Sequence, residues 1–110
     1  MKDSDEKKQI TGYNSWWCLV FYDLPNDTSS AKTASAKFRR WLLESGGNKF
    51  WSCCWIKFCA SREKLESFTA EIKKNLPPDG NVKVLGVTDK QFGQIQIMWG
   101  KMRKPEPLAD

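Results

Sequence analysis

The stretch that most constrains the fold is WWCLVFY, residues 16–22. It is an unbroken apolar and aromatic run, rich in strand-forming side chains and too short for a buried helix, so it predicts a strand covered on both faces. Asp23 ends the run, and the chain then turns at Leu24–Asp27, because proline cannot continue a sheet ladder and Asn and Asp favour turns. We therefore expect a central strand with Asp23 at its carboxyl end.

Two helices are predicted from capping residues and apolar spacing. The first follows a cap at Asp27 or Thr28 and ends near Ser45, before a pair of glycines. The second begins after a cap at Ser61. Each repeats apolar residues at helical spacing: Ala31, Ala34, Phe38, Trp41 and Leu42 in the first, and Leu65, Phe68, Ile72 and Leu76 in the second.

Three further strand regions are expected. Residues 49–59 are dense in aromatics, and either a tight hairpin or a single strand kinked near Ser52-Cys53 fits them. Residues 82–88 predict another strand. In a last strand, Ile95, Ile97 and Trp99 alternate with Gln94, Gln96 and Met98.

This order of elements predicts an α+β fold, a ferredoxin-like βαββαβ sandwich with an extra C-terminal strand. We expect one folded domain at residues 15–100, a disordered tail at 1–14 and a flexible tail at 101–110. A domain of this size buries only about 60–70% of its unfolded surface, so a homodimer would stabilise it.

The net charge of +5 and the pI near 9.1 favour an anionic partner such as nucleic acid. Four basic residues lie around the outer side of the first helix: Lys32, Lys37, Arg39 and Arg40. Their spacing fits contacts to successive phosphates of a duplex, and it equally fits an ordinary solvated helix face. No apolar run is long enough to span a membrane, so we expect a cytoplasmic protein without a membrane partner.

The chain contains no histidine. This excludes histidine-based triads, HExxH zinc sites and a histidine general base, so any catalysis must rest on carboxylates and a metal. The four cysteines Cys18, Cys53, Cys54 and Cys59 form no CxxC pair. We expect them to be reduced and to serve as small apolar packing residues.

Four segments together resemble one known family: FYDLP, KFRRWLLESGG, IKKNLPPDGNVKVLGVTDKQF and GQIQIMWGK. They are similar to the small ferredoxin-like CRISPR-associated protein that partners the spacer-acquisition integrase, in the variant that accompanies type II systems. The resemblance runs from about Trp17 to Lys104. It implies a homodimer that bridges two integrase dimers and holds prespacer duplex DNA next to CRISPR repeat DNA. The family is named an endoribonuclease, because some members cleave RNA or duplex DNA with a divalent metal.

The resemblance also implies roles for individual residues. Asp23 matches the family's metal-site aspartate, which faces its own copy across the dimer axis, so it is the metal ligand for Mg²⁺ or Mn²⁺ and the catalytic residue if the protein is active. Lys37, Arg39 and Arg40 match the family's basic helix segment. Residues 92–99 match a segment that adds a strand to the partner protomer, and the implied dimer and integrase interface comprises Phe92, Ile95, Ile97, Trp99, Lys101 and Arg103.

The chain departs from the family at Trp51–Cys54, where many members have Gln-x-Ser-Val. Cys53 takes the place of a serine implicated in cleavage, and a thiol is a poor partner for magnesium-bound water. We therefore expect a non-catalytic DNA-binding subunit. The alternative is a metal-dependent endonuclease, acting on RNA or duplex DNA, that uses Asp23.

A third, remote alternative is a single-stranded RNA-binding module with an RRM-like sheet, since LVFYDLP and CCWIKF are similar to parts of the RRM signatures. Two departures count against it. Phe21 and Tyr22 lie one position from the expected aromatic, and no Arg-Gly-aromatic-Gly run precedes Trp55.

Overall fold

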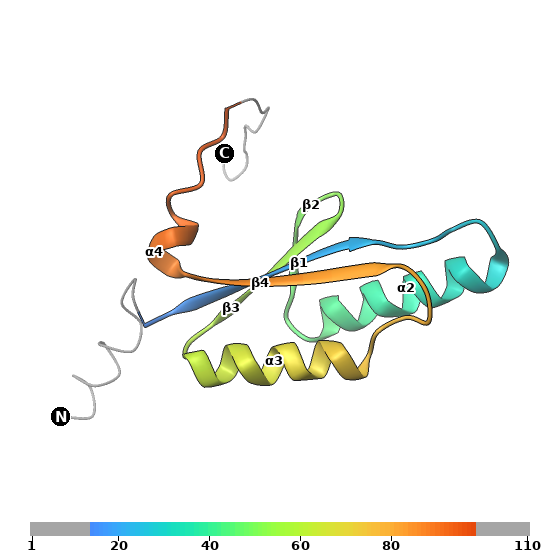
Figure 1. Cartoon of the computed structure of the whole chain (residues 1–110), viewed down its shortest axis with the longest axis horizontal. Helices are drawn as coiled ribbons and strands as arrows, with labels where there is room; N and C mark the ends of the chain where they lie inside the picture. The colour runs from blue at the N-terminus through green and yellow to red at the C-terminus, as the bar shows by residue number, and fades with distance from the viewer. Residues whose placement is uncertain (1–13, 99–110) are drawn as a thin grey trace.

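The strand β1, Trp16–Asp23, lies in the interior of a four-stranded antiparallel sheet with the order β2-β3-β1-β4 (Figure 1). The computed structural model describes residues 14–98. β1 pairs with β3 on one side, with Leu19 opposite Ile56, and with β4 on the other, with Leu19 opposite Leu85. The prediction of a central strand that ends at Asp23 is confirmed.

The two long helices are α2, Ser29–Glu44, and α3, Arg62–Lys74. Thr28 caps α2 by accepting the Ala31 N–H, and Ser61 caps α3 by accepting the Lys64 N–H, as the sequence predicts. α2 ends at Glu44 with Ser45 as its C-cap, and Gly46 then takes a φ of 94°, a backbone conformation that favours glycine.

Between the helices the chain forms a hairpin. β2, Asn48–Trp51, and β3, Cys54–Cys59, are joined by the two-residue turn Ser52-Cys53, and Trp51 lies opposite Cys54. The structure therefore decides between the two predicted alternatives in favour of a hairpin. A shift of register between Lys49 and Trp51 marks an irregularity in β2.

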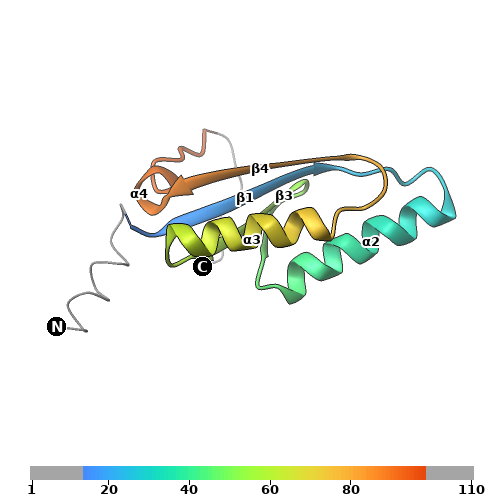
Figure 2. The same ribbon diagram turned by 60° about the horizontal axis from the view of Figure 1, so that its bottom comes forward.

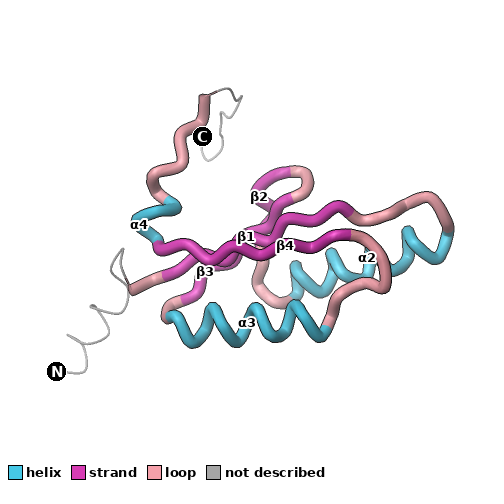
Figure 3. Tube along the Cα trace, in the orientation of Figure 1, coloured by secondary structure: helices cyan, strands magenta, loops and turns pink. Residues whose placement is uncertain are grey.

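α2 and α3 lie side by side on one face of the sheet (Figures 2 and 3). The core between these two layers contains Cys18, Val20, Tyr22, Phe38, Leu42, Trp55, Cys59, Phe68 and Ile72. Lys57 of β3 also faces this layer, where its amine donates to the Ser45 carbonyl and lies over the Phe68 ring. No described helix covers the opposite face apart from α4 at one end, so the prediction that β1 is covered on both faces is wrong for the single chain.

β4, Asn81–Thr88, is followed by the short helix α4, Asp89–Phe92, which is not among the helices predicted from the sequence. Residues 94–98 form no strand, so the predicted extra C-terminal strand is absent from the part of this chain that the structure describes. A strand must pair with the edge of a sheet to satisfy its backbone groups. The chain instead leaves α4 over the face of the sheet away from α2 and α3 (Figure 2), so residues 94–98 do not run along an edge. The predicted tail at residues 1–14 lies outside the described residues except for Asn14. Trp99 and the predicted tail at residues 101–110 lie entirely outside them.

The order β1-α2-β2-β3-α3-β4 is the ferredoxin-like βαββαβ arrangement predicted from the sequence. None of the helices within residues 14–98 has the length and apolar character needed to cross a membrane.

Candidate nucleic-acid and metal site

Asp23 is exposed at the carboxyl end of β1, at the start of the turn that leads into α2. Side chains alternate along a strand, so Asp23 lies on the same side of the sheet as Leu19 and Phe21, the side away from the two long helices. The hydroxyl of Ser35 in α2 donates to the Pro25 carbonyl at 2.9 Å and fixes the turn after Asp23. The carboxylate therefore stands on an ordered backbone.

The hairpin turn Ser52-Cys53 lies beside this end of β1. The Tyr22 N–H donates to the Cys53 carbonyl at 3.0 Å, which extends the ladder between β1 and β3 past its last paired residues. Cys53 is exposed, and its sulfur lies 4.0 Å from the Ser52 hydroxyl. The structure thus brings Asp23 and the Ser52-Cys53 turn to the same end of the sheet.

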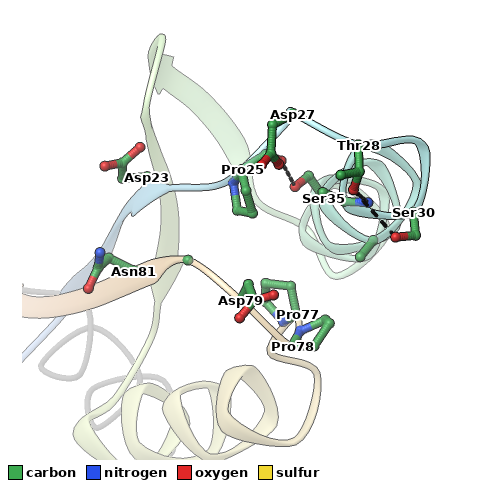
Figure 4. A pocket seen from close by; sticks show the side chains of 13 residues that line it. Asp23, Pro25, Asp27, Thr28, Ser30, Ser35, Pro77, Pro78, Asp79 and Asn81 are labelled. Carbon is green, nitrogen blue, oxygen red and sulfur yellow. Dashed lines mark hydrogen bonds between the residues drawn. The ribbon is translucent and has the colours of Figure 1, made fainter.

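A cavity of about 560 Å³ opens next to Asp23, between the β1–α2 turn and the α3–β4 loop. Three carboxylates line it, from Asp23, Asp27 and Asp79. Figure 4 shows the Asp23 carboxylate directed away from Asp79. Residues 14–98 contain no group of three Asp, Glu or Cys side chains arranged to hold a metal ion.

The donor chemistry nevertheless fits the metal that the resemblance implies, provided two chains contribute. Mg²⁺ is usually bound by one or two carboxylates together with water and substrate phosphates. One chain offers the exposed carboxylate of Asp23 on the open side of the sheet, and a second copy would offer another. The residues that would hold the ion are therefore the two copies of Asp23.

Three of the four cysteines are buried, as predicted, and Cys53 is the exception. Burial raises the pKa of the Cys18 thiol from 9.0 to about 12, with a smaller contribution from neighbouring Cys59. Burial also raises the pKa of the Cys54 and Cys59 thiols. These three thiols stay protonated and act as apolar packing groups.

The four basic residues of α2 lie outside the core contacts of the helix. Lys32, Lys37 and Arg40 are exposed and Arg39 is partly buried, while Ser35, Phe38 and Leu42 form the buried stripe. Lys37 and Arg40 are neighbours at i, i+3, and Lys32 and Arg39 lie two turns apart on the other flank. No ion pair that the structure describes uses these four side chains; the salt bridges are both on α3.

The face of the sheet opposite the helices is apolar and aromatic, and we call it the open face. Its exposed fractions are 40% for Phe21, 43% for Phe50, 43% for Phe58 and 51% for Leu85. Trp17 and Phe92 continue this surface, with Phe58 packed edge-on against Trp17 at 5.3 Å. Asp23 lies on the same side of the sheet, next to Phe21.

The predicted interface residues fall into two groups. Phe92 belongs to α4 rather than to a strand, while Ile95 and Ile97 are 46% and 72% exposed in the segment after it. Trp99, Lys101 and Arg103 lie outside the described residues. A signal for α4 was present in the sequence, because Thr88 and Gln91 have the T-x-x-Q spacing of a capping box and form one.

Comparison with known proteins is consistent with this geometry. The profile of the family described as CRISPR associated protein Cas2 matches residues 16–95. The chain belongs to this family. The match extends from β1 through α4, so it covers the whole sheet, both long helices and the turn that carries Asp23.

Several curated relatives are similar over most of their length. The CRISPR-associated endoribonuclease Cas2 of Flavobacterium psychrophilum is 41% identical over 93 residues, which are 84% of this chain and 81% of the relative. The protein of the same name from Parvibaculum lavamentivorans is 38% identical over 89 residues, 81% of this chain and 88% of the relative. The protein of the same name from Paracidovorax avenae is 30% identical over 100 residues, which are 91% of this chain and 93% of the relative. These Cas2 relatives are named endoribonucleases.

Proposed function

We propose that this chain is the dimeric, DNA-binding bridging subunit of a CRISPR spacer-acquisition complex in the prokaryotic cytoplasm. In this role it holds prespacer duplex DNA between integrase dimers and meets CRISPR repeat DNA. Membership in the Cas2 family supports the proposal. The observation that carries it is the open face of the sheet, an uncovered aromatic surface in a small basic protein.

The open face is suited to a second copy of the chain. Large contiguous apolar surfaces on a small protein mark interaction sites, and the aromatic side chains here are those enriched at the centres of protein interfaces. A two-fold interface uses the same patch on both subunits, so the patch must be complementary to itself. A face that is largely apolar meets this requirement. Packing two open faces would also bring the two copies of Asp23 toward one interface.

Dimerisation doubles the basic surface that can bind DNA. Each protomer contributes a net charge of +5 and the four basic residues of α2, on the helix layer that faces away from the proposed interface. Contacts from Lys and Arg to phosphates are independent of base sequence and release counterions. Such a surface fits duplexes of varied sequence, as a bridging subunit requires.

The second candidate function is a metal-dependent endonuclease that acts on RNA or duplex DNA. The observations that favour it are the exposed Asp23 and the name of the relatives, endoribonuclease. A Mg²⁺ or Mn²⁺ ion held by two copies of Asp23 would supply positive charge next to a scissile phosphate. In this chain the neighbouring turn offers the thiol of Cys53 and the hydroxyl of Ser52, which favours the non-catalytic role.

Dimerisation is tested by light scattering of the purified chain and of the variant Phe58→Lys, which places a charge in the open face. We expect a dimer for the unmodified chain and a monomer for the variant. Lys73→Glu, a charge change at the exposed end of α3, is the control and should stay dimeric. A monomeric unmodified chain would contradict the proposal.

The bridging role is tested by reconstituting spacer integration with the partner integrase, prespacer DNA and Asp23→Asn. We expect integration to require this chain and to survive the substitution, because the amide keeps the size of the carboxylate. Loss of integration by Asp23→Asn in a complex that still assembles would contradict a non-catalytic role. Cleavage of RNA or duplex DNA that needs Mg²⁺ or Mn²⁺, stops with chelator and stops in Asp23→Asn would establish the endonuclease instead.

A further inference from the structure

Each strand that the structure describes contains one charged residue: Asp23 in β1, Lys49 in β2, Lys57 in β3 and Lys83 in β4. Residues directly opposite each other in an antiparallel pair lie on the same face of the sheet. Lys49 lies opposite Trp55 and Lys57 lies opposite Cys18, and both of these partners belong to the core beneath the helices. Lys83 lies opposite Phe21 of the open face. Among the residues of these strands, Asp23 and Lys83 are therefore the two charges on the open face.

These two charges, Asp23 and Lys83, lie on neighbouring strands at the same end of the sheet. Asp23 is paired with Asn81 and Phe21 with Lys83, so Lys83 is the diagonal neighbour of Asp23. Diagonal neighbours on one face are about 7–8 Å apart, a distance that a long side chain can span. Both side chains are exposed, and within residues 14–98 neither forms a hydrogen bond or an ion pair. Figure 4 shows the neighbouring strand ends that carry Asp23 and Asn81.

Covering the open face with a second copy removes these charges from water. A carboxylate that loses its water without gaining a counter-charge is costly, and two carboxylates that are brought close together repel each other. The neighbours of Asp23 in the register cannot compensate it, because Phe21 is apolar and Asn81 is neutral. Asp23 in a dimer therefore needs a positive charge, and either a divalent cation or a basic side chain can supply it.

We propose that Lys83 is the built-in counter-charge of Asp23 in the dimer, and that its amine supplies the positive charge that Mg²⁺ or Mn²⁺ would otherwise supply. This inference rests on the dimer of the proposed function. Two-fold symmetry repeats the pair, so the interface receives two carboxylates together with two amines, and their charges cancel. The face that is covered is then apolar apart from charges that compensate one another.

A lysine suits this position because its amine is a compact charge on a flexible stem, which can adjust to either copy of Asp23. The same amine weakens a metal site, since carboxylates that are already neutralised attract a divalent cation less strongly. Lys83 thus makes the dimer independent of a divalent cation and lowers the affinity of the two Asp23 carboxylates for one. This property distinguishes a bridging subunit from a metal-dependent endonuclease that has the same aspartate.

Metal titration tests the competition between Lys83 and a divalent cation. The signal of free Mn²⁺ in electron paramagnetic resonance measures Mn²⁺ binding by the purified dimer. We expect Lys83→Gln to bind Mn²⁺ at least about ten times more tightly than the unmodified protein, because its carboxylates lack their counter-charge. Adding Asp23→Asn to this variant should abolish the gain. Lys49→Gln is the matched control, because it removes the same charge from the face that carries the helices. Equal Mn²⁺ affinities of Lys83→Gln and Lys49→Gln would overturn the inference.

The dissociation constant of the dimer gives a second readout, measured by sedimentation over a dilution series in the presence of chelator. Lys83→Gln should raise this constant at least about tenfold, and replacing the chelator with Mn²⁺ should reverse the change. The double variant with Asp23→Asn should recover most of the loss, because the repulsion between carboxylates is gone. A dimeric unmodified protein whose Lys83→Gln variant dissociates no more readily than Lys49→Gln overturns the inference and leaves the proposed function intact. A monomeric unmodified protein overturns both.

Discussion

The indole N–H of Trp55 donates a hydrogen bond of 3.0 Å to the hydroxyl of Tyr22 in the core. The Tyr22 hydroxyl in turn lies 3.4 Å from the Ser52 carbonyl, to which it donates. Tyr22 directly precedes Asp23, and Ser52 is in the hairpin turn. This short network therefore fixes the hairpin next to the candidate metal ligand, through groups that are 30 and 33 residues apart in sequence.

Tyr22→Phe should destabilise the fold by about 1–3 kcal/mol, because it leaves the buried Trp55 N–H without its acceptor. Urea unfolding of the purified protein measures this change. Trp55→Phe and the double variant complete a double-mutant cycle, which isolates the hydrogen bond from the loss of packing. Additive effects of the two substitutions would show that the bond contributes nothing to stability.

The stability of the protein should fall as the pH rises above about 9, in part because of Cys18. Burial holds the pKa of this thiol at about 12 in the folded chain, against 9.0 when it is exposed. Between these values the unfolded chain releases the proton and the folded chain keeps it. Below a pH of 9.0 the contribution of Cys18 to stability does not change with pH. Above it the free energy of unfolding decreases by up to about 1.4 kcal/mol per pH unit.

Other groups also titrate in this range, so Cys18→Ala is compared with the unmodified protein at each pH, in the presence of a reductant. The cavity left by alanine lowers the stability of the variant by an amount that does not depend on pH. We expect the difference between the two proteins to shrink as the pH rises through this window. Parallel curves would show that Cys18 keeps an ordinary pKa in the folded state.

The sequence predicts those parts of the fold that are decided locally. Thr28 and Ser61 identify the two long helices because a cap acts on backbone groups two or three residues away. The apolar run before Asp23 identifies the central strand for a similar reason. The T-x-x-Q signal at Thr88 was equally local and could have located α4.

The parts that sequence could not decide depend on distant contacts. Ser52-Cys53 has no residue typical of a tight hairpin turn, and the turn is held by Tyr22 from another strand. Ile95 and Ile97 have strand periodicity, but no edge of their own sheet is offered to them where the chain leaves α4. The role of Asp23 as a metal ligand stays a prediction, because residues 14–98 contain no group of three Asp, Glu or Cys side chains that could hold a metal ion.

Charge reversal on the outer face of α2 should weaken DNA binding and reduce its dependence on salt. Each phosphate contact contributes about 0.9 to the slope of log affinity against log salt concentration. Arg40→Glu removes an exposed cation opposite the buried stripe of the helix, so the slope should fall by about one for each protomer that contacts the duplex. Fluorescence anisotropy with a labelled duplex, repeated over a range of salt concentrations, measures it.

Lys73→Glu on α3 is the control for this experiment, since it makes the same charge change on an exposed residue of the other helix. An equal loss of slope in both variants would indicate a diffuse charge effect. An unchanged slope in Arg40→Glu would place the DNA contacts on another surface of the protein.

Gly86→Ala should destabilise the fold by about 1 kcal/mol, the low end of the usual cost of overpacking, because the group that must move is the partly buried side chain of Leu65 in α3. A Cβ at this position would lie 2.6 Å from a terminal methyl carbon of Leu65, which packs against the core from α3. Gly93→Ala is the matched control, because its Cβ would come no closer than 3.5 Å to any neighbour and its φ of −67° suits alanine. Urea unfolding should show a loss for Gly86→Ala that Leu65→Ala in the same chain partly relieves. Equal stability of the two glycine variants would mean that α3 moves away from β4 without cost.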